Sequence, residues 1–555
     1  MQKTDKDLEK EVLELREIIK GHFPFSSIRP AQERALEAIA RAELKNKRFI
    51  ILELPTGVGK SGIAYAISSW ASTLNDKGYK PGAYILTTQK TLQRQYMRDF
   101  ADKGMVELKG AANYRCNEFD LDCSSGSKLK KILAGEEGQQ VCTGCPYKRA
   151  KYLFTKNPIG VTNFAYFLNE TKYVNQLEPR SFLIIDEAHN SEKEILGFAD
   201  IEITKSRTAS LGIEDPPIVD EDDPDTNEKI YNWIYQIFDP AGATMEAQLL
   251  FDMKNAKLAG DDEATLEVSR KHDALDKFLC KVRRFDRDNY KEWFIYSNPE
   301  TGALYLKPTT ANLFSHDLLF SMGKRIVMMS ATILDKATFC RNLGIDPKEA
   351  GFLRLESDFP VENRRIFFTP VGKMGMSNIE NTMPKMLKKI LEIMNKHPNE
   401  KGIIHCQSYK IQKAISEFIG KTKHKHRLLA HGSGFGERDQ AIETHNNSEE
   451  PTILLSPSMT EGLDLKDDLS RWQIICKIPY PYLGDKFIKY RLNKDPKWYQ
   501  WMTALVMVQA TGRSIRSKED YSMTYVLDSD FGFFLHKCDS ILPQWWKDSI
   551  VYEED

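Results

Sequence analysis

The chain has 555 residues, enough for three or four domains of ordinary size. Apolar residues make up 41% and charged residues 28%, which is typical of a folded globular protein and excludes a collagen-like or wholly disordered chain. The 78 basic and 79 acidic residues nearly cancel, so any surface that binds nucleic acid has to be locally basic.

The sequence also bears on where the protein works. No apolar run approaches the roughly 18 residues that a membrane helix needs, so we expect no membrane association. The charged N-terminal segment lacks the apolar stretch of a secretory signal. We therefore expect a cytoplasmic, intracellular protein whose nine cysteines are thiols or metal ligands, not disulfides.

The distribution of apolar residues predicts two α/β domains. Residues 5–20 have the periodicity of an amphipathic helix. Between 48 and 200, short apolar runs alternate with helical patterns, which indicates buried parallel strands. From about 200 to 312 this alternation stops, and the segment opens with an acidic stretch that we interpret as a solvated loop. A second alternating series follows residue 360 and predicts a second parallel-sheet domain.

The segment ELPTGVGKS follows an apolar run and precedes a helical one, which is the context of a phosphate-binding loop. Its glycines let backbone N–H groups turn around phosphates, its lysine neutralises the β- and γ-phosphates, and its serine hydroxyl ligates Mg²⁺. Leu54 stands where the strict pattern has Gly, and the alternative is an ordinary turn before a helix. The candidate nucleotide-binding residues of this loop are Thr56, Gly57, Gly59, Lys60 and Ser61.

The run FLIIDEAHN predicts an apolar strand that ends in two carboxylates. We expect Asp186 to hold Mg²⁺ through its water shell and Glu187 to polarise the attacking water. His189 follows and could sense the nucleotide state. Such a pair often only caps a helix, but the phosphate loop upstream favours the catalytic interpretation.

The segment VMVQATGRSIRS lies in the second α/β series. Arg513 and Arg516 are three residues apart and share a helical face, so both could reach a γ-phosphate across a cleft as arginine fingers. Gln509 lies four residues before Arg513 and could contact the same phosphate or the water. The alternative is a solvated basic helix.

Two shorter segments support this set. MMSATI contains Ser330 and Thr332, whose hydroxyls could link the two α/β domains. SPSMTEGLDL places Glu461, Gly462 and Asp464 in a loop after a strand.

Four of the nine cysteines gather between the phosphate loop and IIDEAH. They are Cys116, Cys123, Cys142 and Cys145. Four thiolates can bind zinc tetrahedrally or hold a [4Fe–4S] cluster, and the spacing alone does not choose between them. The other five cysteines are scattered, mostly in apolar or helical segments, and are interpreted as ordinary buried thiols.

Basic and aromatic residues alternate around the cysteines, which suits single-stranded nucleic acid: cations for phosphates and rings for bases. The rings are Tyr114, Tyr147, Tyr152 and Phe154, and the cations are Lys128, Lys130, Lys131, Lys148, Arg149, Lys151 and Lys156. A second candidate surface is KVRRFDRDNYKEWF at 281–294. The alternative for both is an amphipathic helix with a core face.

Seven segments occur in the order of the superfamily 2 helicase motifs: ELPTGVGKS, TTQKTLQRQY, IIDEAH, MMSATI, HCQSYK, SPSMTEGLDL and QATGRSIR. The chain resembles the XPD/DinG family of iron–sulfur DNA helicases from about residue 25 to 530. RPAQ resembles the family's adenine-side motif, which makes Gln32 a candidate contact to ATP. NYRC and CPYKRA resemble the family's cluster domain and favour iron–sulfur over zinc.

The resemblance implies an α/β fold of two RecA-like parallel-sheet motor domains, with an inserted iron–sulfur domain and a mainly helical arch. The expected boundaries are 1–104 with 160–198 and 313–345 for the first motor domain, 105–159 for the iron–sulfur domain, 199–312 for the arch and 346–555 for the second motor domain. It further implies ATP with Mg²⁺ and a [4Fe–4S] cluster as cofactors. The implied activity is 5′ to 3′ movement on single-stranded DNA with unwinding of duplexes and forks, and we expect a monomer. The alternatives are a DNA-stimulated ATPase that translocates without unwinding, and a structural subunit of a repair complex.

Overall fold

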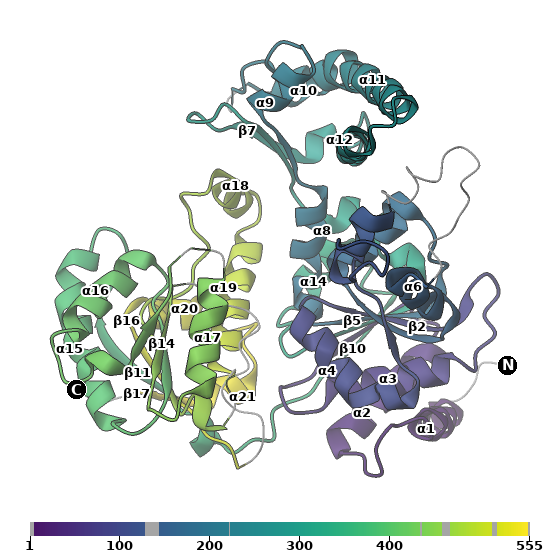
Figure 1. Cartoon of the computed structure of the whole chain (residues 1–555). Coiled ribbons are helices and arrows are strands. Elements are labelled where there is room, and N and C mark those ends of the chain that lie inside the picture. Colours follow the sequence, from purple (N-terminus) through teal and green to yellow (C-terminus); the bar gives the residue numbers. More distant parts are fainter. Residues whose placement is uncertain are drawn as a thin grey trace.

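The computed structural model describes residues 5–127, 144–220, 223–432, 434, 436–457, 465, 467–512 and 519–552. Two α/β domains lie side by side, and a smaller, mainly helical domain stands above the first (Figure 1). Within these ranges, no helix is both long and apolar enough to cross a membrane.

The first domain is built on seven parallel strands in the order β10-β1-β9-β5-β2-β4-β3. They are β1 (Phe49–Glu53), β2 (Lys80–Thr87), β3 (Val106–Glu107), β4 (Ile159–Asn163), β5 (Arg180–Asp186), β9 (Gly323–Ser330) and β10 (Ala350–Arg354). Every residue of β1 and β5 is buried, as expected of parallel strands covered on both faces. The predicted buried parallel strands are therefore confirmed.

Side chains of successive strand residues point to opposite faces, and helices cover both. Ile50 and Leu52 join one apolar cluster, whereas Phe49 and Ile51 join the other. The helices whose buried residues belong to the first cluster are α1 (Asp5–Lys20), α2 (Pro30–Leu44), α3 (Lys60–Ala71) and α4 (Lys90–Phe100). The helices of this domain whose buried residues belong to the second cluster are α6 (Pro146–Lys156), α7 (Phe164–Asn169), α8 (Ser191–Ala199), α13 (Ser315–Leu318) and α14 (Lys336–Leu343).

Two of the predicted boundaries of this domain are wrong. Strand β10 lies beyond the predicted limit at residue 345, yet it pairs with β1 from Phe49↔Ala350 onward and completes the first sheet. Strand β3 lies inside the predicted 105–159 insertion, yet it pairs with β4 from Val106↔Gly160, and Ile159, the first residue of β4, pairs with Ala83 of β2 in the same sheet. The sheet therefore includes short edge strands that have no long apolar run of their own.

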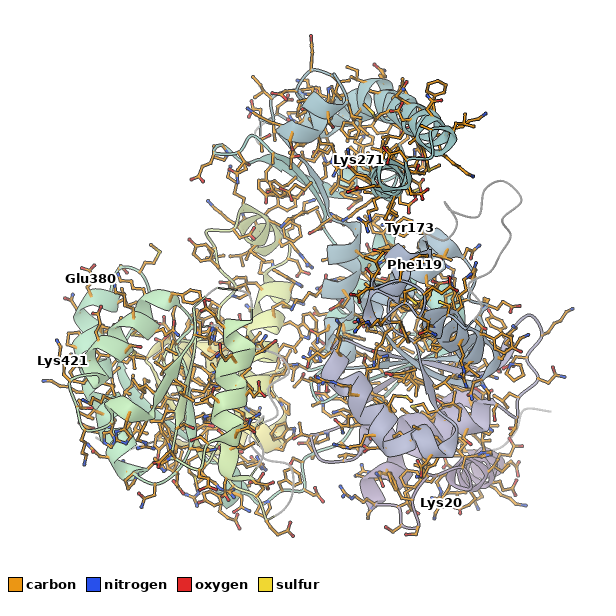
Figure 2. All side chains as sticks on the ribbon, in the orientation of Figure 1. Lys20, Phe119, Tyr173, Lys271, Glu380 and Lys421 are labelled. Carbon is orange, nitrogen blue, oxygen red and sulfur yellow. The ribbon has the colours of Figure 1, made fainter. Side chains whose placement is uncertain are left out.

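The third domain, the predicted arch, combines helices with a small antiparallel sheet of order β6-β8-β7. Its strands are β6 (Ile201–Ile203), β7 (Trp293–Ser297) and β8 (Leu304–Pro308), and its helices are α9 (Lys205–Ser210), α10 (Thr226–Trp233), α11 (Asp239–Leu258) and α12 (Asp262–Val282). Figure 2 shows Phe119 and Tyr173 on the side of the first domain that faces this arch.

The second α/β domain has seven parallel strands in the order β13-β14-β12-β15-β16-β11-β17. They are β11 (Ile366–Gly372), β12 (Gly402–His405), β13 (Leu428–Ala430), β14 (Ile453–Ser456), β15 (Trp472–Ile475), β16 (Met523–Asp528) and β17 (Ile550–Tyr552). The helices are α15 (Ile379–Lys396), α16 (Tyr409–Ile419), α17 (Glu437–Asn447), α18 (Lys486–Lys494), α19 (Pro496–Thr511), α20 (Asp530–Cys538) and α21 (Gln544–Lys547).

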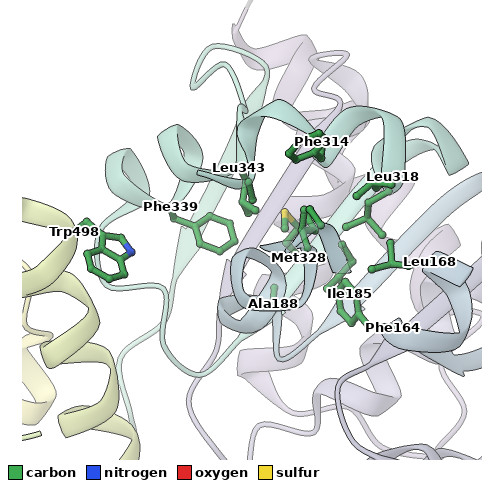
Figure 3. Packing of buried hydrophobic residues seen from close by; sticks show 14 of the residues in the cluster. Phe164, Leu168, Ile185, Ala188, Phe314, Leu318, Met328, Phe339, Leu343 and Trp498 are labelled. Carbon is green, nitrogen blue, oxygen red and sulfur yellow. The ribbon is translucent and has the colours of Figure 1, made fainter. Parts of the chain in front are cut away.

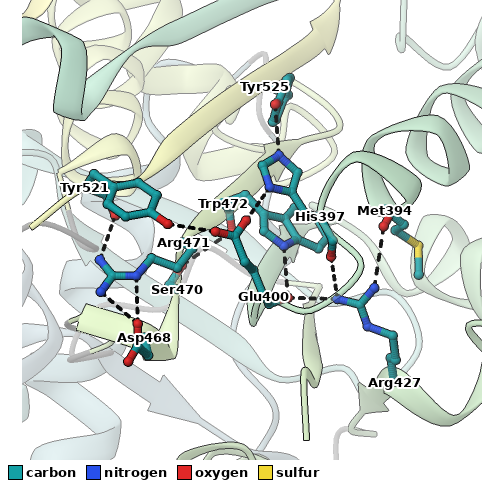
Figure 4. Close-up of polar contacts among 10 residues, drawn as sticks. All are labelled: Met394, His397, Glu400, Arg427, Asp468, Ser470, Arg471, Trp472, Tyr521 and Tyr525. Carbon is teal, nitrogen blue, oxygen red and sulfur yellow. Dashed lines mark hydrogen bonds and ion pairs between the residues drawn. The ribbon is translucent and has the colours of Figure 1, made fainter.

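A polar network closes the edge of this sheet where β12 and β15 begin (Figure 4). The Glu400 carboxylate lies 2.6 Å from His397 Nδ1 and accepts a hydrogen bond of 2.7 Å from the Tyr521 hydroxyl. Arg427 donates to the carbonyls of His397 and Glu400. This network lies at the amino ends of the strands, away from the carboxyl ends where ligands of parallel sheets bind.

Candidate nucleotide site between the two α/β domains

The loop between β1 and α3 has the backbone that a phosphate-binding loop requires. Gly57 and Gly59 have φ angles of 81° and 85°, a region that glycine adopts without strain. A Cβ atom on Gly59 would lie 2.6 Å from Gln32 Nε2, so a side chain here would also displace its neighbour. Helix α3 begins at Lys60, and its first N–H groups can bind an anion.

Leu54, the departure from the strict loop pattern, has a structural explanation. Its side chain is completely buried, and its N–H donates to the carbonyl of Ser330 over 2.8 Å. Position 54 therefore continues β1 alongside β9, and the turn around the phosphates starts after it. An apolar residue suits this position better than glycine.

Gln32, the adenine-side candidate, packs against the phosphate loop. It is buried near the start of α2, and its Oε1 accepts a hydrogen bond of 2.9 Å from the Arg29 N–H. Its Nε2 donates to the carbonyl of Gly59 over 3.5 Å, and Arg29 Nη1 donates to the carbonyl of Gly57 over 2.5 Å. The RPAQ segment is thereby held against both glycines of the loop.

The carboxylates at the end of β5 meet the phosphate loop. Lys60 Nζ lies 3.9 Å from Glu187 Oε1, so the two segments converge although 126 residues separate Lys60 from Asp186. Asp186 is almost completely buried, and its Oδ1 accepts a hydrogen bond of 2.9 Å from the Glu187 N–H. Burial, reinforced by the neighbouring Glu187 charge, raises the pKa of Asp186 to about 6, whereas the Lys60 ammonium acts in the opposite direction.

Tyr96 is a functional candidate that the sequence reasoning missed. Its hydroxyl donates to Asp186 Oδ2 over 2.8 Å, and the residue is completely buried on α4. Gln93, Tyr96 and Phe100 form the buried stripe of this helix. A tyrosine in such a stripe needs a partner for its hydroxyl, and this could have drawn attention to it.

A series of polar contacts leads from Glu187 to the second domain. Glu187 Oε2 lies 3.4 Å from His189 Nδ1, which lies 2.8 Å from Ser330 Oγ. Ser330 Oγ accepts from the Thr332 N–H over 3.0 Å, and Thr332 Oγ1 accepts from Gln509 Nε2 on α19 over 2.9 Å. The structure thus places Ser330 and Thr332 between the two domains, as MMSATI predicts.

The apolar core continues across the same boundary. Figure 3 shows Trp498 of α19 at the edge of the cluster that contains Phe339 and Leu343 of α14. Trp501 Nε1 donates to the carbonyl of Ile333 over 2.8 Å. Helix α19 is therefore packed on the segment that follows β9 along several turns. The remaining predicted partners from the second domain, Asp464, Arg513 and Arg516, lie outside the described residues.

The donor set at this site fits Mg²⁺, which prefers carboxylate and hydroxyl oxygens together with the oxygens of a bound phosphate. Asp186 at the end of β5 supplies the carboxylate, and Ser61 in the first turn of α3 supplies a hydroxyl. Among the residues that the structure describes, no group of three metal-binding side chains is preassembled.

The predicted cysteine site is only partly described. The Cys123 and Cys145 sulfurs are 3.4 Å apart, and Cys145 caps the N-terminus of α6. A Cβ atom on Gly126 would lie 2.6 Å from Cys116 Sγ, so a glycine there leaves room for the third thiol. Cys142 lies outside the described residues. Of the scattered cysteines, Cys340, Cys406, Cys476 and Cys538 are buried, as predicted.

Part of the first predicted basic–aromatic surface is core instead. Phe154 is completely buried and stacks on Tyr84, with 5.5 Å between ring centroids. Lys151 forms an ion pair with the buried Glu170. Tyr152, by contrast, is 62% exposed. Lys128, Lys130 and Lys131 lie outside the described residues.

The second predicted surface, 281–294, contacts the first domain and is also partly core, although Arg287 and Lys291 are exposed. Phe285 and Trp293 are buried against each other. The Arg284 guanidinium lies 4.5 Å from the centroid of Phe198, and Arg283 forms an ion pair of 2.8 Å with Asp239. The core part of the alternative therefore holds for these two rings, but the helix does not, because α12 ends at Val282 and β7 begins at Trp293.

Comparison with known proteins agrees with this architecture. Residues 25–212 match the family model described as the res subunit of type III restriction enzymes, and residues 390–549 match the helicase C-terminal domain. The chain is 22% identical to the probable ATP-dependent helicase MJ0942 of Methanocaldococcus jannaschii, over 94% of each chain. It is 25% identical to the ATP-dependent DNA helicase DinG of Photobacterium profundum, over 42% of this chain but only 36% of that one.

Solved structures show the same fold. One described as an XPD helicase covers 100% of both chains with a TM-score of 0.57 at 14% identity. The Xpd4 structure of S. tokodaii covers 95% of this chain and 100% of that one, with a TM-score of 0.55 at 13% identity. Together with the helicase relatives and the helicase C-terminal match, the two RecA-like parallel-sheet domains support an ATP-dependent helicase of superfamily 2. Within that superfamily, these similarities support a helicase of the XPD/DinG type.

Proposed function

We propose that the protein is a DNA helicase that couples ATP hydrolysis to movement along single-stranded DNA, in the 5′ to 3′ direction that the family resemblance implies. One observation carries the proposal. The contacts from Lys60 through Glu187, His189, Ser330 and Thr332 reach Gln509 in the second domain without interruption. A change at the Glu187 carboxylate during hydrolysis can therefore be transmitted through these contacts to the boundary between the two α/β domains.

The residues have separate roles in this proposal. Lys60 and the N-terminus of α3 bind the β- and γ-phosphates. Mg²⁺, when bound, neutralises charge that develops on the transferred phosphoryl group, and Asp186 and Ser61 would hold it. Glu187 orients the attacking water and accepts its proton. Arg513 and Arg516 are proposed to contact the γ-phosphate from the second domain, with Gln509 beside them.

We further propose that Cys116, Cys123, Cys142 and Cys145 hold a [4Fe–4S] cluster, with zinc as the alternative metal. Thiolates suit both, so the support is the thiol chemistry of the donor set and the family resemblance. The contact between Cys123 and Cys145 and the space beside Gly126 are compatible with a shared site. The exposed ring of Tyr152 would stack on an unpaired base.

The experiment is a strand-separation assay on duplexes with a 5′ tail, a 3′ tail, a fork or blunt ends, with iron and zinc measured on the same anaerobic preparation. We expect unwinding of the 5′-tailed and forked duplexes only, loss of ATPase and unwinding in Lys60→Ala, and bound iron. Cys145→Ser should lose iron and most unwinding but keep part of the DNA-stimulated ATPase, because the motor domains have their own cores. ATP hydrolysis without strand separation on any substrate would favour the translocase alternative, and zinc in the parent would refute the cluster.

A further inference from the structure

Helix α18 contacts three parts of the molecule. It follows β15, and Figure 1 shows it above the second α/β domain, beneath the arch. One of its faces meets α8 of the first domain, another meets the arch sheet, and its C-terminal end leads into α19. The motor motifs of the sequence do not include it.

Its contact with the first domain is a buried ion pair. Arg491 Nη2 lies 2.8 Å from Glu192 Oε1, and the two side chains are 5% and 8% exposed. The second oxygen of Glu192 accepts hydrogen bonds from Trp498 Nε1 over 3.2 Å and from Asn342 Nδ2 over 3.3 Å. The Arg491 guanidinium also lies 3.8 Å from the centroid of Trp498. Because each charge would be unpaired without the other, separating this pair is costly.

Its contact with the arch is aromatic. The ring centroids of Phe487 and Tyr490 lie 5.9 and 4.7 Å from that of Phe294 on β7. Lys307 Nζ of β8 lies 5.3 Å from the centroid of Phe487. The arch therefore rests on the same helix that is fixed to α8.

Helix α8 itself joins the hydrolytic site to the arch. It begins at Ser191, directly after the segment that contains Glu187 and His189, and ends at Ala199, just before β6 enters the arch. Glu192 lies in its first turn. At the other side, α19 runs from Trp498 beside this ion pair to Gln509 at the domain boundary.

We propose that the Glu192–Arg491 pair is the pivot about which the second motor domain closes on ATP, and that α18 transmits this closure to the arch. Arg491 is thus a positioning residue: it touches no substrate, but it fixes α18 on the helix that follows the catalytic carboxylates. This proposal rests on one part of the proposed function, namely that ATP binding closes the two α/β domains. It predicts that the arch responds to nucleotide through α18.

The test is hydrogen–deuterium exchange of the full chain with and without Mg²⁺ and a non-hydrolysable ATP analogue. In the parent, we expect the analogue to change exchange both in the phosphate loop and in β7. In Arg491→Met, which retains a long apolar side chain beside Trp498, the phosphate loop should respond as in the parent while the β7 response is lost. The double variant Glu192→Gln/Arg491→Met leaves no charge unpaired and should behave in the same way, so a folding defect of the single variant would not obscure the result.

A matched control is available at the same domain boundary. Arg341 on α14 pairs with Asp495 over 2.5 Å, but its side chain is 48% exposed. Arg341→Met should leave both exchange responses unchanged, because exposed pairs contribute little. The proposal would be overturned if the analogue changed exchange in β7 of Arg491→Met as much as in the parent. It would also be overturned if the analogue left exchange in β7 of the parent unchanged.

A second measurement separates coupling from general damage. The number of base pairs separated per ATP hydrolysed should fall about 5- to 150-fold in both Arg491 variants, the usual range of coupling between sites, while KM for ATP stays within about twofold. Equal losses of ATPase and unwinding would indicate a merely structural contact and contradict the proposal. A parent that shows the β7 response but unwinds nothing would contradict the proposed helicase activity alone.

Discussion

Removing the Tyr96 hydroxyl should impair ATP hydrolysis without disturbing the fold. Tyr96→Phe deletes the donor of a 2.8 Å hydrogen bond to Asp186, and both side chains are buried. A hydrogen bond to a charged group contributes about 1.5–3 kcal/mol, which corresponds to about ten- to hundredfold in a rate or binding constant. Because this bond also lowers the pKa of Asp186, its loss should move the acidic limb of the kcat/KM profile for Mg·ATP to higher pH.

The assay is steady-state ATPase over a range of Mg²⁺ concentrations and pH, and Tyr65→Phe is its control. Tyr65 stacks on Phe100, which Tyr96 also contacts, and its hydroxyl donates to the carbonyl of Lys103 over 2.8 Å. Both variants remove one tyrosine hydroxyl from the same core, but only Tyr96→Phe removes a hydroxyl that donates a hydrogen bond to Asp186. Equal kcat/KM in the two variants would refute the reasoning that Tyr96 orients the carboxylate.

The remaining predictions address the other parts of the molecule. Gln509→Leu loses its bond to Thr332, so kcat for ATP should fall about fivefold, for a bond of about 1 kcal/mol, with KM unchanged. Burial raises the pKa of Asp200 to about 6, so the folded state binds this proton more tightly and stability falls as pH rises from about 4 to about 6, by up to about 3 kcal/mol. Asp200→Asn should therefore raise the midpoint of urea unfolding at pH 8 and leave it nearly unchanged at pH 4. Tyr152→Ala should weaken binding of single-stranded DNA by about 1–3 kcal/mol without changing the melting temperature, whereas Phe154→Ala should cost about 3–5 kcal/mol of stability.

The parts of the fold that sequence could predict are those with a strong local pattern. The central strands β1 and β5 are continuous apolar runs, and the two glycines of ELPTGVGKS require the φ angles that the structure shows. Strand β10 escaped prediction because it is a short edge strand whose one partner, β1, is about 300 residues away in the chain. Its assignment to the first sheet depends on a tertiary contact that no local pattern encodes.

Side-chain roles were harder to predict than elements. Basic–aromatic composition does not reveal which side chains of a segment are buried. The sequence therefore predicted that the segments of Phe154 and Trp293 bind bases, although both rings belong to the core. Tyr96 was missed because its partner Asp186 lies 90 residues away in the chain, and only the fold brings the hydroxyl to that carboxylate. Glu192 follows Asp186 and Glu187 closely in the sequence, but its partner Arg491 lies 299 residues away, and only the folded chain brings them together.

The central claim is that Glu187, whose carboxylate faces Lys60, orients the water that hydrolyses ATP in a motor of two α/β domains. The most direct test is to measure ATP binding, ATP hydrolysis and strand separation in one preparation of Glu187→Gln, which retains the shape of the side chain but removes the charge that orients water. We predict that ATP still binds, that hydrolysis falls to background and that no strand is displaced. Hydrolysis and strand separation at the parent's rates would contradict the account, because the water would then be activated elsewhere.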